Sequence, residues 1–138
     1  MLITQEYIDE LTYKIIGCAI EVHRHLGPGL IESVYERCFI RELTLSHLDF
    51  KRQILFPIHY KGIDLDAELR LDVLVNDLIL VELKAIDGLL PIHEAQLLTY
   101  MKFLNLPKGI LINFNCLNIF SQGQKTLVNE LYAALPKQ

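Results

Sequence analysis

The chain has 138 residues, of which 51% are hydrophobic, and its formal net charge at pH 7 is −4. This length suits one domain over residues 1–138, and the apolar content excludes an intrinsically disordered chain. The negative charge excludes a generally basic nucleic-acid surface, so any grip on phosphates must come from local clusters such as Lys51 with Arg52. The apolar excess predicts surface for a second copy of the chain, as in a homodimer.

Three cysteines, Cys18, Cys38 and Cys116, are widely separated and follow no CxxC pattern. They indicate neither a disulfide framework nor a zinc knuckle, and buried reduced thiols are expected. The N-terminus lacks the basic-then-apolar pattern of a signal peptide, and no apolar run approaches the roughly 20 residues of a membrane span. We therefore expect a cytoplasmic protein that does not insert into a membrane.

Two helices are predicted at the start of the chain. Apolar residues recur at three- and four-residue spacing over residues 4–25, with Thr4 as the N-cap and Gly27 with Pro28 as the stop. A second helix is predicted over residues 30–46. Its apolar stripe comprises Ile31, Val34, Tyr35, Cys38, Phe39 and Leu43.

Extended segments rich in β-branched and aromatic residues follow. The pairs Lys61-Gly62 and Asn76-Asp77 are predicted turns between them. Residues 78–81 are apolar on both faces, which is typical of an interior strand. The predicted strands cover residues 50–60, 63–65, 69–75 and 78–84.

Helical spacing returns over residues 91–105, beginning at Pro91 and ended by Pro107. A further apolar strand is predicted over residues 109–114, and residues 124–135 fit either a short strand or a helix. This order predicts an α/β fold with a mixed central sheet flanked by helices.

Glu82 and Lys84 carry the first sign of chemistry. Side chains alternate along a strand, so these two residues share one face of a segment that is otherwise apolar. Burying either charge unpaired costs several kcal/mol, roughly, so something must compensate them. A salt bridge between the two is one explanation, and a site at the strand's end that holds a metal ion and a substrate is the other.

Asp72 lies in another apolar strand, ten residues before Glu82. Two carboxylates brought together without a cation would repel, whereas Mg²⁺ between them would keep both ionised. Such a metal can bind a phosphate oxygen and activate a water, and Lys84 would hold that water or stabilise the growing negative charge. The pattern therefore indicates a divalent-metal site of the kind that nucleases use.

The turn between the two strands decides whether Asp72 and Glu82 can meet. A two-residue hairpin would point Asp72 away from Glu82. A three-residue loop over residues 75–77 would place Asp72 opposite Leu80, diagonal to Glu82 on the same face. We therefore predict an odd or bulged reversal here.

Gln96 and Tyr100 are four residues apart on the helix after the strand, so they share a face, which His93 joins. This polar stripe is expected to lean over the site. Glu32 lies in the first turn of the second helix, where an acid also complements the helix dipole.

Residues 29–35, Gly-Leu-Ile-Glu-Ser-Val-Tyr, resemble the signature of the GxxExxY protein family, and residues 91–100 resemble that family as well. The resemblance covers about residues 8–128. This family is grouped with the PD-(D/E)xK nuclease-like superfamily, whose active site combines a helical Glu, a strand Asp, a strand Glu-x-Lys and often a Gln and Tyr on a following helix. Carried over by motif, these fall on Glu32, Asp72, Glu82, Lys84, Gln96 and Tyr100. Leu71 replaces the usual Pro before the Asp.

The resemblance implies a restriction-endonuclease-like core and a phosphodiesterase that depends on Mg²⁺ or Mn²⁺. Asp72 and Glu82 would hold the metal with support from Glu32, Lys84 would position or activate water, and Gln96 and Tyr100 would orient the site. DNA or RNA is the expected substrate. The alternative is a catalytically silent binding or assembly module that keeps the fold.

Overall fold

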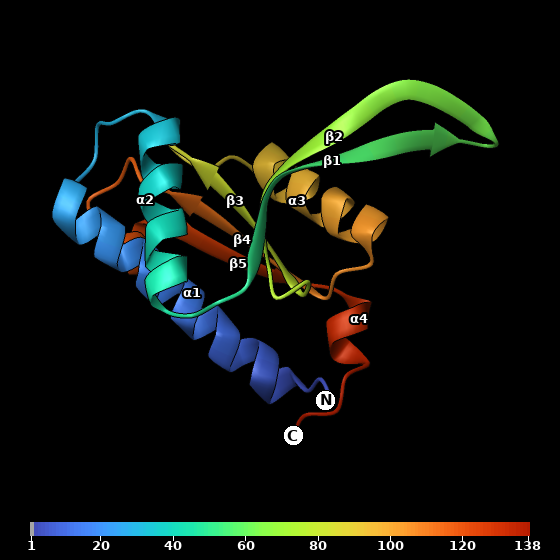
Figure 1. Ribbon diagram of the computed structural model, residues 1–138, viewed down its shortest axis with the longest axis horizontal. Coiled ribbons are helices and arrows are strands. Elements are labelled where there is room, and N and C mark those ends of the chain that lie inside the picture. The colour runs from blue at the N-terminus through green and yellow to red at the C-terminus, as the bar shows by residue number, and fades with distance from the viewer. Residues whose placement is uncertain (1) are drawn as a thin grey trace.

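The first helix, α1, spans Gln5–Leu26 in a computed structural model that describes residues 2–138 (Figure 1). The Thr4 hydroxyl accepts a hydrogen bond from the Tyr7 N–H at 3.0 Å, which confirms the predicted N-cap. Gly27 ends the helix with a φ of 70°, a left-handed conformation that glycine adopts without strain.

The second helix, α2, spans Glu32–Leu45 and begins two residues later than predicted. Its predicted stripe is confirmed at Phe39 and Leu43, which are fully buried, and is wrong at Ile31, which is 69% exposed. Ile31 is the extended N-cap residue, so its side chain lies outside the helical repeat that buries the others.

Tyr35 connects α2 to the sheet and to the loop before the helix. Its buried ring stacks on Phe114, with the ring centroids 4.5 Å apart and the planes 4° apart. Its hydroxyl donates a hydrogen bond to the Gly27 carbonyl and accepts one from the Leu30 N–H at 3.1 Å. Tyr35 is thus a packing residue that also fixes the loop, in which Gly29 has a φ of 99°.

Five strands form one mixed sheet in the order β1-β2-β3-β4-β5. The β1–β2, β2–β3 and β4–β5 pairs are antiparallel, and the β3–β4 pair is parallel. This confirms the predicted mixed sheet with flanking helices, two of them N-terminal. The strands are β1 (Phe50–Tyr60), β2 (Ile63–Val75), β3 (Ile79–Lys84), β4 (Lys108–Asn113) and β5 (Gln124–Val128).

The hairpin of β1 and β2 extends away from the rest of the molecule, beyond the nearest helix (Figure 1). The two segments predicted at residues 63–65 and 69–75 form one strand of 13 residues. Apolar and polar residues alternate without interruption over residues 63–73, so the pattern itself favours one strand, and dividing it in two was an error of the prediction. The outer part carries exposed apolar side chains at Leu55, Tyr60, Ile63 and Leu65.

Helices cover the two faces of the sheet. Helices α1 and α2 pack on one face, where Val81 and Leu83 of β3 join their core. Helix α3 (Pro91–Leu104) packs on the other face, where Leu80 lies in a cluster with Leu97 and Met101. The alternation along β3 therefore sends Glu82 and Lys84 to the α3 side.

The C-terminal segment contains both alternatives that the sequence left open. A five-residue π-helical turn, η1 (Ile119–Gly123), leads into β5, and a short helix, α4 (Glu130–Ala133), follows it. Strand β5 completes the sheet beside β4.

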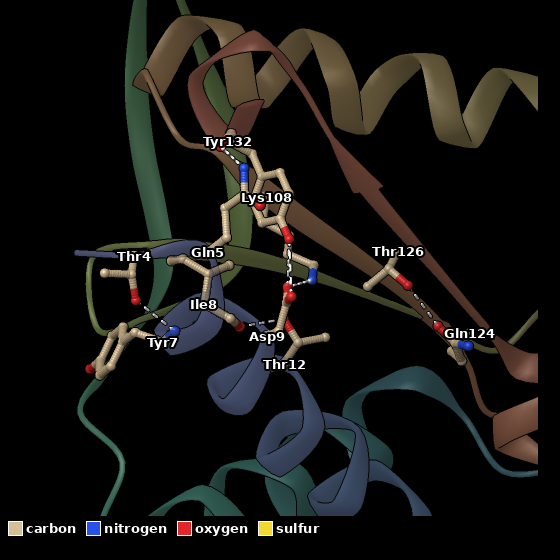
Figure 2. A network of polar contacts seen from close by, with 10 residues as sticks. All are labelled: Thr4, Gln5, Tyr7, Ile8, Asp9, Thr12, Lys108, Gln124, Thr126 and Tyr132. Carbon is tan, nitrogen blue, oxygen red and sulfur yellow. Dashed lines mark hydrogen bonds and ion pairs between the residues drawn. The ribbon is translucent and has the colours of Figure 1, made fainter. Parts of the chain in front are cut away.

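A polar network joins α1, β4 and α4 (Figure 2). The buried Lys108 ammonium pairs with the Asp9 carboxylate at 3.1 Å, and the Tyr132 hydroxyl donates to the same carboxylate at 2.9 Å. Close by, the Gln5 side chain donates to the Tyr132 carbonyl, and the Gln5 N–H donates to the Pro136 carbonyl. These contacts connect the two ends of the chain.

Cys18 is buried, and Cys38 and Cys116 are half-buried; all three are free thiols, as expected. Within residues 2–138, no helix has the length and apolar character needed to cross a membrane.

Candidate active site

The central feature of the site is a pair of carboxylates on the neighbouring strands β2 and β3. The ladder between these strands covers only three pairs, the last of which is Val73 with Val81. One step further, the Asp72 N–H donates to Oε2 of Glu82 at 2.9 Å, and the Leu83 N–H donates to Oδ2 of Asp72 at 2.8 Å. The carboxylates thus lie on the same side, where each takes a backbone hydrogen bond from the other strand.

The reversal between β2 and β3 makes this possible. Val75 pairs with Ile79, so the loop holds the odd number of residues that the sequence predicted. Its position was predicted one residue too early, because it covers residues 76–78 rather than 75–77. Asn76 and Asp77 both have positive φ, and the chain turns so tightly there that Leu78 belongs to the loop. Asp72 therefore lies level with Glu82 instead of diagonal to it.

Glu82 is a buried acid, with 7% of its surface exposed. Burial raises its pKa to about 9, and the nearby negative charge of Asp72 adds to that shift. Lys84 opposes the shift, since its ammonium favours the ionised carboxylate. Without a cation, the pair therefore binds a proton at neutral pH.

Glu32 and Lys84 belong to the same electrostatic unit. Glu32 is the first residue of α2. Its burial is the main cause of a raised pKa, the negative charge of Asp72 raises that pKa further, and the ammonium of Lys84 lowers it. Lys84 is half-buried at the end of β3. The helical Glu, the strand Asp and the Glu-x-Lys pair therefore influence one another electrostatically.

Of the three residues of the α3 stripe, Tyr100 lies near the carboxylates, Gln96 is exposed, and His93 contacts the start of the helix. Burial raises the pKa of Tyr100, and the charges of Glu82 and then Asp72 raise it further. Gln96 is exposed, and its side chain makes no hydrogen bond to any described residue. His93 accepts a hydrogen bond from the Leu90 N–H at 2.9 Å, so it helps to cap the start of α3.

The donor set suits a cation that keeps several waters. The described part of the chain holds no group of three or more His, Cys, Asp and Glu side chains arranged around a metal position. Mg²⁺ commonly uses only one or two carboxylates, together with water and substrate phosphates. Asp72 and Glu82 fit that pattern, because two desolvated carboxylates side by side need a positive charge if both are to ionise.

Lys51 and Arg52, proposed from the sequence as a phosphate-binding cluster, are separated in the structure. Lys51 pairs with Asp77 at 2.9 Å, whereas Arg52 pairs with Glu36 of α2 at 2.7 Å. The buried Glu36 also accepts a hydrogen bond from Gln53 at 2.7 Å.

Sequence reasoning missed Glu36 and Gln53. The one available signal was that Glu36 follows Glu32 by four residues, which places both on one face of α2. Gln53 has a φ of 50°, an uncommon conformation for a residue within a strand, and propensity does not predict it.

A model of the PD-(D/E)XK nuclease superfamily matches residues 9–126. This range includes all six candidate site residues and the sheet as far as the middle of β5. No curated protein and no solved structure matches the chain significantly.

Proposed function

Because the chain belongs to the PD-(D/E)XK nuclease superfamily, we propose that it is a Mg²⁺- or Mn²⁺-dependent nuclease that hydrolyses phosphodiester bonds of DNA or RNA. The observation that carries the proposal is the reciprocal hydrogen bonding of Asp72 and Glu82. It holds two carboxylates side by side at the point where β2 leaves β3. Residues 1–138 would act as a single catalytic domain.

Asp72 and Glu82 would hold the metal, and Glu32 would support it through water. When bound, the metal would polarise the phosphate and lower the pKa of a bound water. The hydrogen bonds from Asp72 N–H and Leu83 N–H fix one oxygen of each carboxylate, so that the other is directed for binding.

Lys84 would hold the attacking water or stabilise the negative charge that develops on phosphorus oxygens. Its location two residues after Glu82 supports this role. Tyr100 would orient the site from α3, and its position near both carboxylates supports that assignment. Gln96 would contact the substrate backbone from the exposed part of α3.

Within the superfamily, we assign the chain to the GxxExxY family. The signature Gly29-x-x-Glu32-x-x-Tyr35 supports this, because its three named residues work together in the structure. Gly29 permits the turn, Tyr35 fixes the loop by two hydrogen bonds, and Glu32 then begins α2 beside the carboxylates. The free thiols fit a reducing compartment such as the cytoplasm.

Cleavage of nucleic acids tests the proposal directly. Purified protein is incubated with single- and double-stranded DNA and RNA in the presence of Mg²⁺, Mn²⁺ or EDTA. We expect metal-dependent cleavage that Lys84→Ala abolishes and Lys125→Ala, an exposed lysine of β5, leaves unchanged. If Lys84→Ala cleaved as fast as wild type, the activity would be assigned to a contaminating nuclease.

A silent binding or assembly module is the second candidate. The observation that favours it is the lack, in the described chain, of a group of three metal-binding side chains. A silent module would bind Mn²⁺ no better than its Asp72→Asn variant does.

We also propose a homodimer in which the projecting β1–β2 hairpin contacts the second copy. Its exposed Tyr60 and Ile63 support this, because a two-stranded ribbon needs a cover for its apolar side chains. Sedimentation of wild type and of Tyr60→Ser with Ile63→Ser tests it, and a monomeric wild type would contradict it.

A further inference from the structure

A cavity of about 390 Å³ opens beside the carboxylate pair, between α2 and the strands β1 and β2. Its volume falls at the lower end of the roughly 300–1,000 Å³ that small-molecule sites occupy. The lining includes two of the candidate site residues, Glu32 and Asp72. The cavity is thus continuous with the site but is built largely from other side chains.

The cavity carries three positive and three negative side chains. The cations are Arg37, Arg52 and Arg70, and the anions are Glu32, Glu36 and Asp72. Three against three gives no net charge. A divalent cation on Asp72 and Glu82 would make the combined site positive, so its preference for an anion would depend on the metal.

The six charges are not equivalent, because one pair is already satisfied. Glu36 is buried and accepts hydrogen bonds from Arg52 and Gln53, both at 2.7 Å. Gln53 reaches it from a left-handed backbone conformation, a kind of local strain that is concentrated at functional sites. This cluster forms a wall between α2 and β1 in which the charge of Arg52 is already paired with Glu36.

Arg37 and Arg70 remain as the available cations. Among the residues that the structure describes, neither has an ion-pair partner, and both side chains are exposed. Arg70 precedes Asp72 by two residues in β2, and Arg37 lies five residues after Glu32 in α2. Two guanidinium groups therefore line the cavity from opposite sides.

We propose that this cavity binds a phosphate of the nucleic-acid backbone next to the one being cleaved, held by Arg37 and Arg70. The inference rests on the proposed function and extends it to a second substrate contact. A guanidinium matches a phosphate with two parallel hydrogen bonds, which gives orientation as well as affinity. Such a contact would set the register of the scissile bond over the metal without reading its sequence.

Binding rather than cleavage provides the test. Lys84→Ala serves as the background so that the probe survives, and fluorescein-labelled DNA and RNA oligonucleotides are titrated by anisotropy in Mg²⁺ at several NaCl concentrations. Arg37→Ala and Arg70→Ala are each added to this background. Arg41→Ala is the matched control, because Arg41 lies one turn further along α2 and lines the groove against α1, which Arg37 also borders, but does not line the cavity.

We expect Arg37→Ala and Arg70→Ala each to weaken binding about tenfold and to reduce the slope of log Kd against log salt by about one. Arg41→Ala should change neither. Arg70→Lys keeps the positive charge but loses the planar guanidinium. It should therefore restore the salt dependence of Kd but not the full affinity. Melting temperatures close to that of the background protein show that the variants are folded.

Equal losses of affinity in all three alanine variants would overturn the inference, because binding would then depend only on the total positive charge of the protein. Unchanged binding in the Arg37 and Arg70 variants, or no binding by the background protein, would overturn it as well. Cleavage by wild type is scored separately. If wild type cleaves nucleic acid but binding does not depend on Arg37 and Arg70, only the proposed phosphate site in the cavity is refuted. If binding depends on the two arginines but wild type does not cleave, only the proposed nuclease activity is refuted.

Discussion

The Asp72 backbone N–H binds the Glu82 carboxylate at a distance of 2.9 Å, at the level where the β2–β3 ladder stops. In a continued ladder the backbone N–H groups here would donate to carbonyls of the neighbouring strand, whereas the N–H groups of Asp72 and Leu83 donate to the two carboxylates. The strands separate instead, and the carboxylates occupy the space between them. The backbone of the sheet therefore positions both acids.

Metal binding should depend on this pair. We expect Mn²⁺ binding to wild type to release or absorb measurable heat. In Asp72→Asn and in Glu82→Gln, we expect either no binding or an affinity for Mn²⁺ at least about tenfold weaker. Isothermal titration calorimetry measures this. Asp64→Asn, in the projecting hairpin, is the control and should bind as wild type does; equal binding by all variants would exclude the carboxylate pair as the metal site.

The pH dependence of stability should reveal the buried Glu82. Its pKa is about 9 in the folded protein and near 4.5 in the unfolded chain, so the folded state holds the additional proton between these values. The stabilisation is complete below the unfolded pKa and is lost as pH rises towards the folded pKa. In EDTA, the free energy of unfolding should therefore fall from about pH 5 to about pH 9, by at most about 1.4 kcal/mol per pH unit.

Urea unfolding at several pH values checks this, and Glu82→Gln should flatten the profile, since the amide does not titrate. Mg²⁺ or Mn²⁺ should restore stability most at high pH, where the carboxylates are ready to bind it. A metal-free profile that rises through this range would contradict the prediction.

Tyr35→Phe should separate packing from positioning. The stack on Phe114 survives, but the hydrogen bonds to Gly27 and Leu30 are lost, which should reduce the free energy of unfolding by about 1–2 kcal/mol. Because the loop then no longer fixes the start of α2, we also expect weaker cleavage, with Mn²⁺ affinity little changed. Urea unfolding, nuclease assays and calorimetry on one preparation measure the three quantities.

Tyr132→Phe provides the comparison, since it too removes one hydrogen-bonded tyrosine hydroxyl but lies in the network of Figure 2. It should lower stability without affecting cleavage. Equal loss of activity in both variants would attribute the effect of Tyr35→Phe to stability alone.

The same network predicts an unequal response to the loss of its two charges. Asp9→Asn leaves the Lys108 ammonium buried without its counter-charge and should destabilise the protein by about 2–3 kcal/mol. Lys108→Met removes the buried charge itself and keeps the apolar stem, so its effect should stay below about 1 kcal/mol. Thermal unfolding distinguishes the two, with the neighbouring Glu10→Gln as control. A greater loss for Lys108→Met would indicate that the ion pair is strongly stabilising.

Local patterns predicted most of the fold. Helix α1 begins after Thr4 and ends before Gly27, as the capping preferences of these residues predict. Lys61 and Gly62 form the hairpin turn, and both have positive φ. The prediction failed for β2 because it divided the strand in two, although apolar and polar residues alternate throughout residues 63–73. The outer part of the strand is exposed on both faces, so its alternation indicates an extended strand but not a buried core.

The site could be predicted as a set of residues but not as an arrangement. The ten-residue separation of Asp72 and Glu82 required an odd loop, and the structure contains one. Its position depended on the backbone conformations of Asn76 and Asp77, which allow Leu78 to leave the strand. The Arg52–Glu36 contact joins residues 16 apart through tertiary packing, so no local signal records it.

The contacts between the chain ends bear on how the protein is made. Gln5 donates hydrogen bonds to Tyr132 and Pro136, and Glu6 donates one to Lys137. During synthesis, these contacts of the first turn of α1 can form only after residues 132–137 have been made. Until the strands are synthesised, the apolar face of α1 lacks the residues that bury it, so this helix completes its packing late in folding.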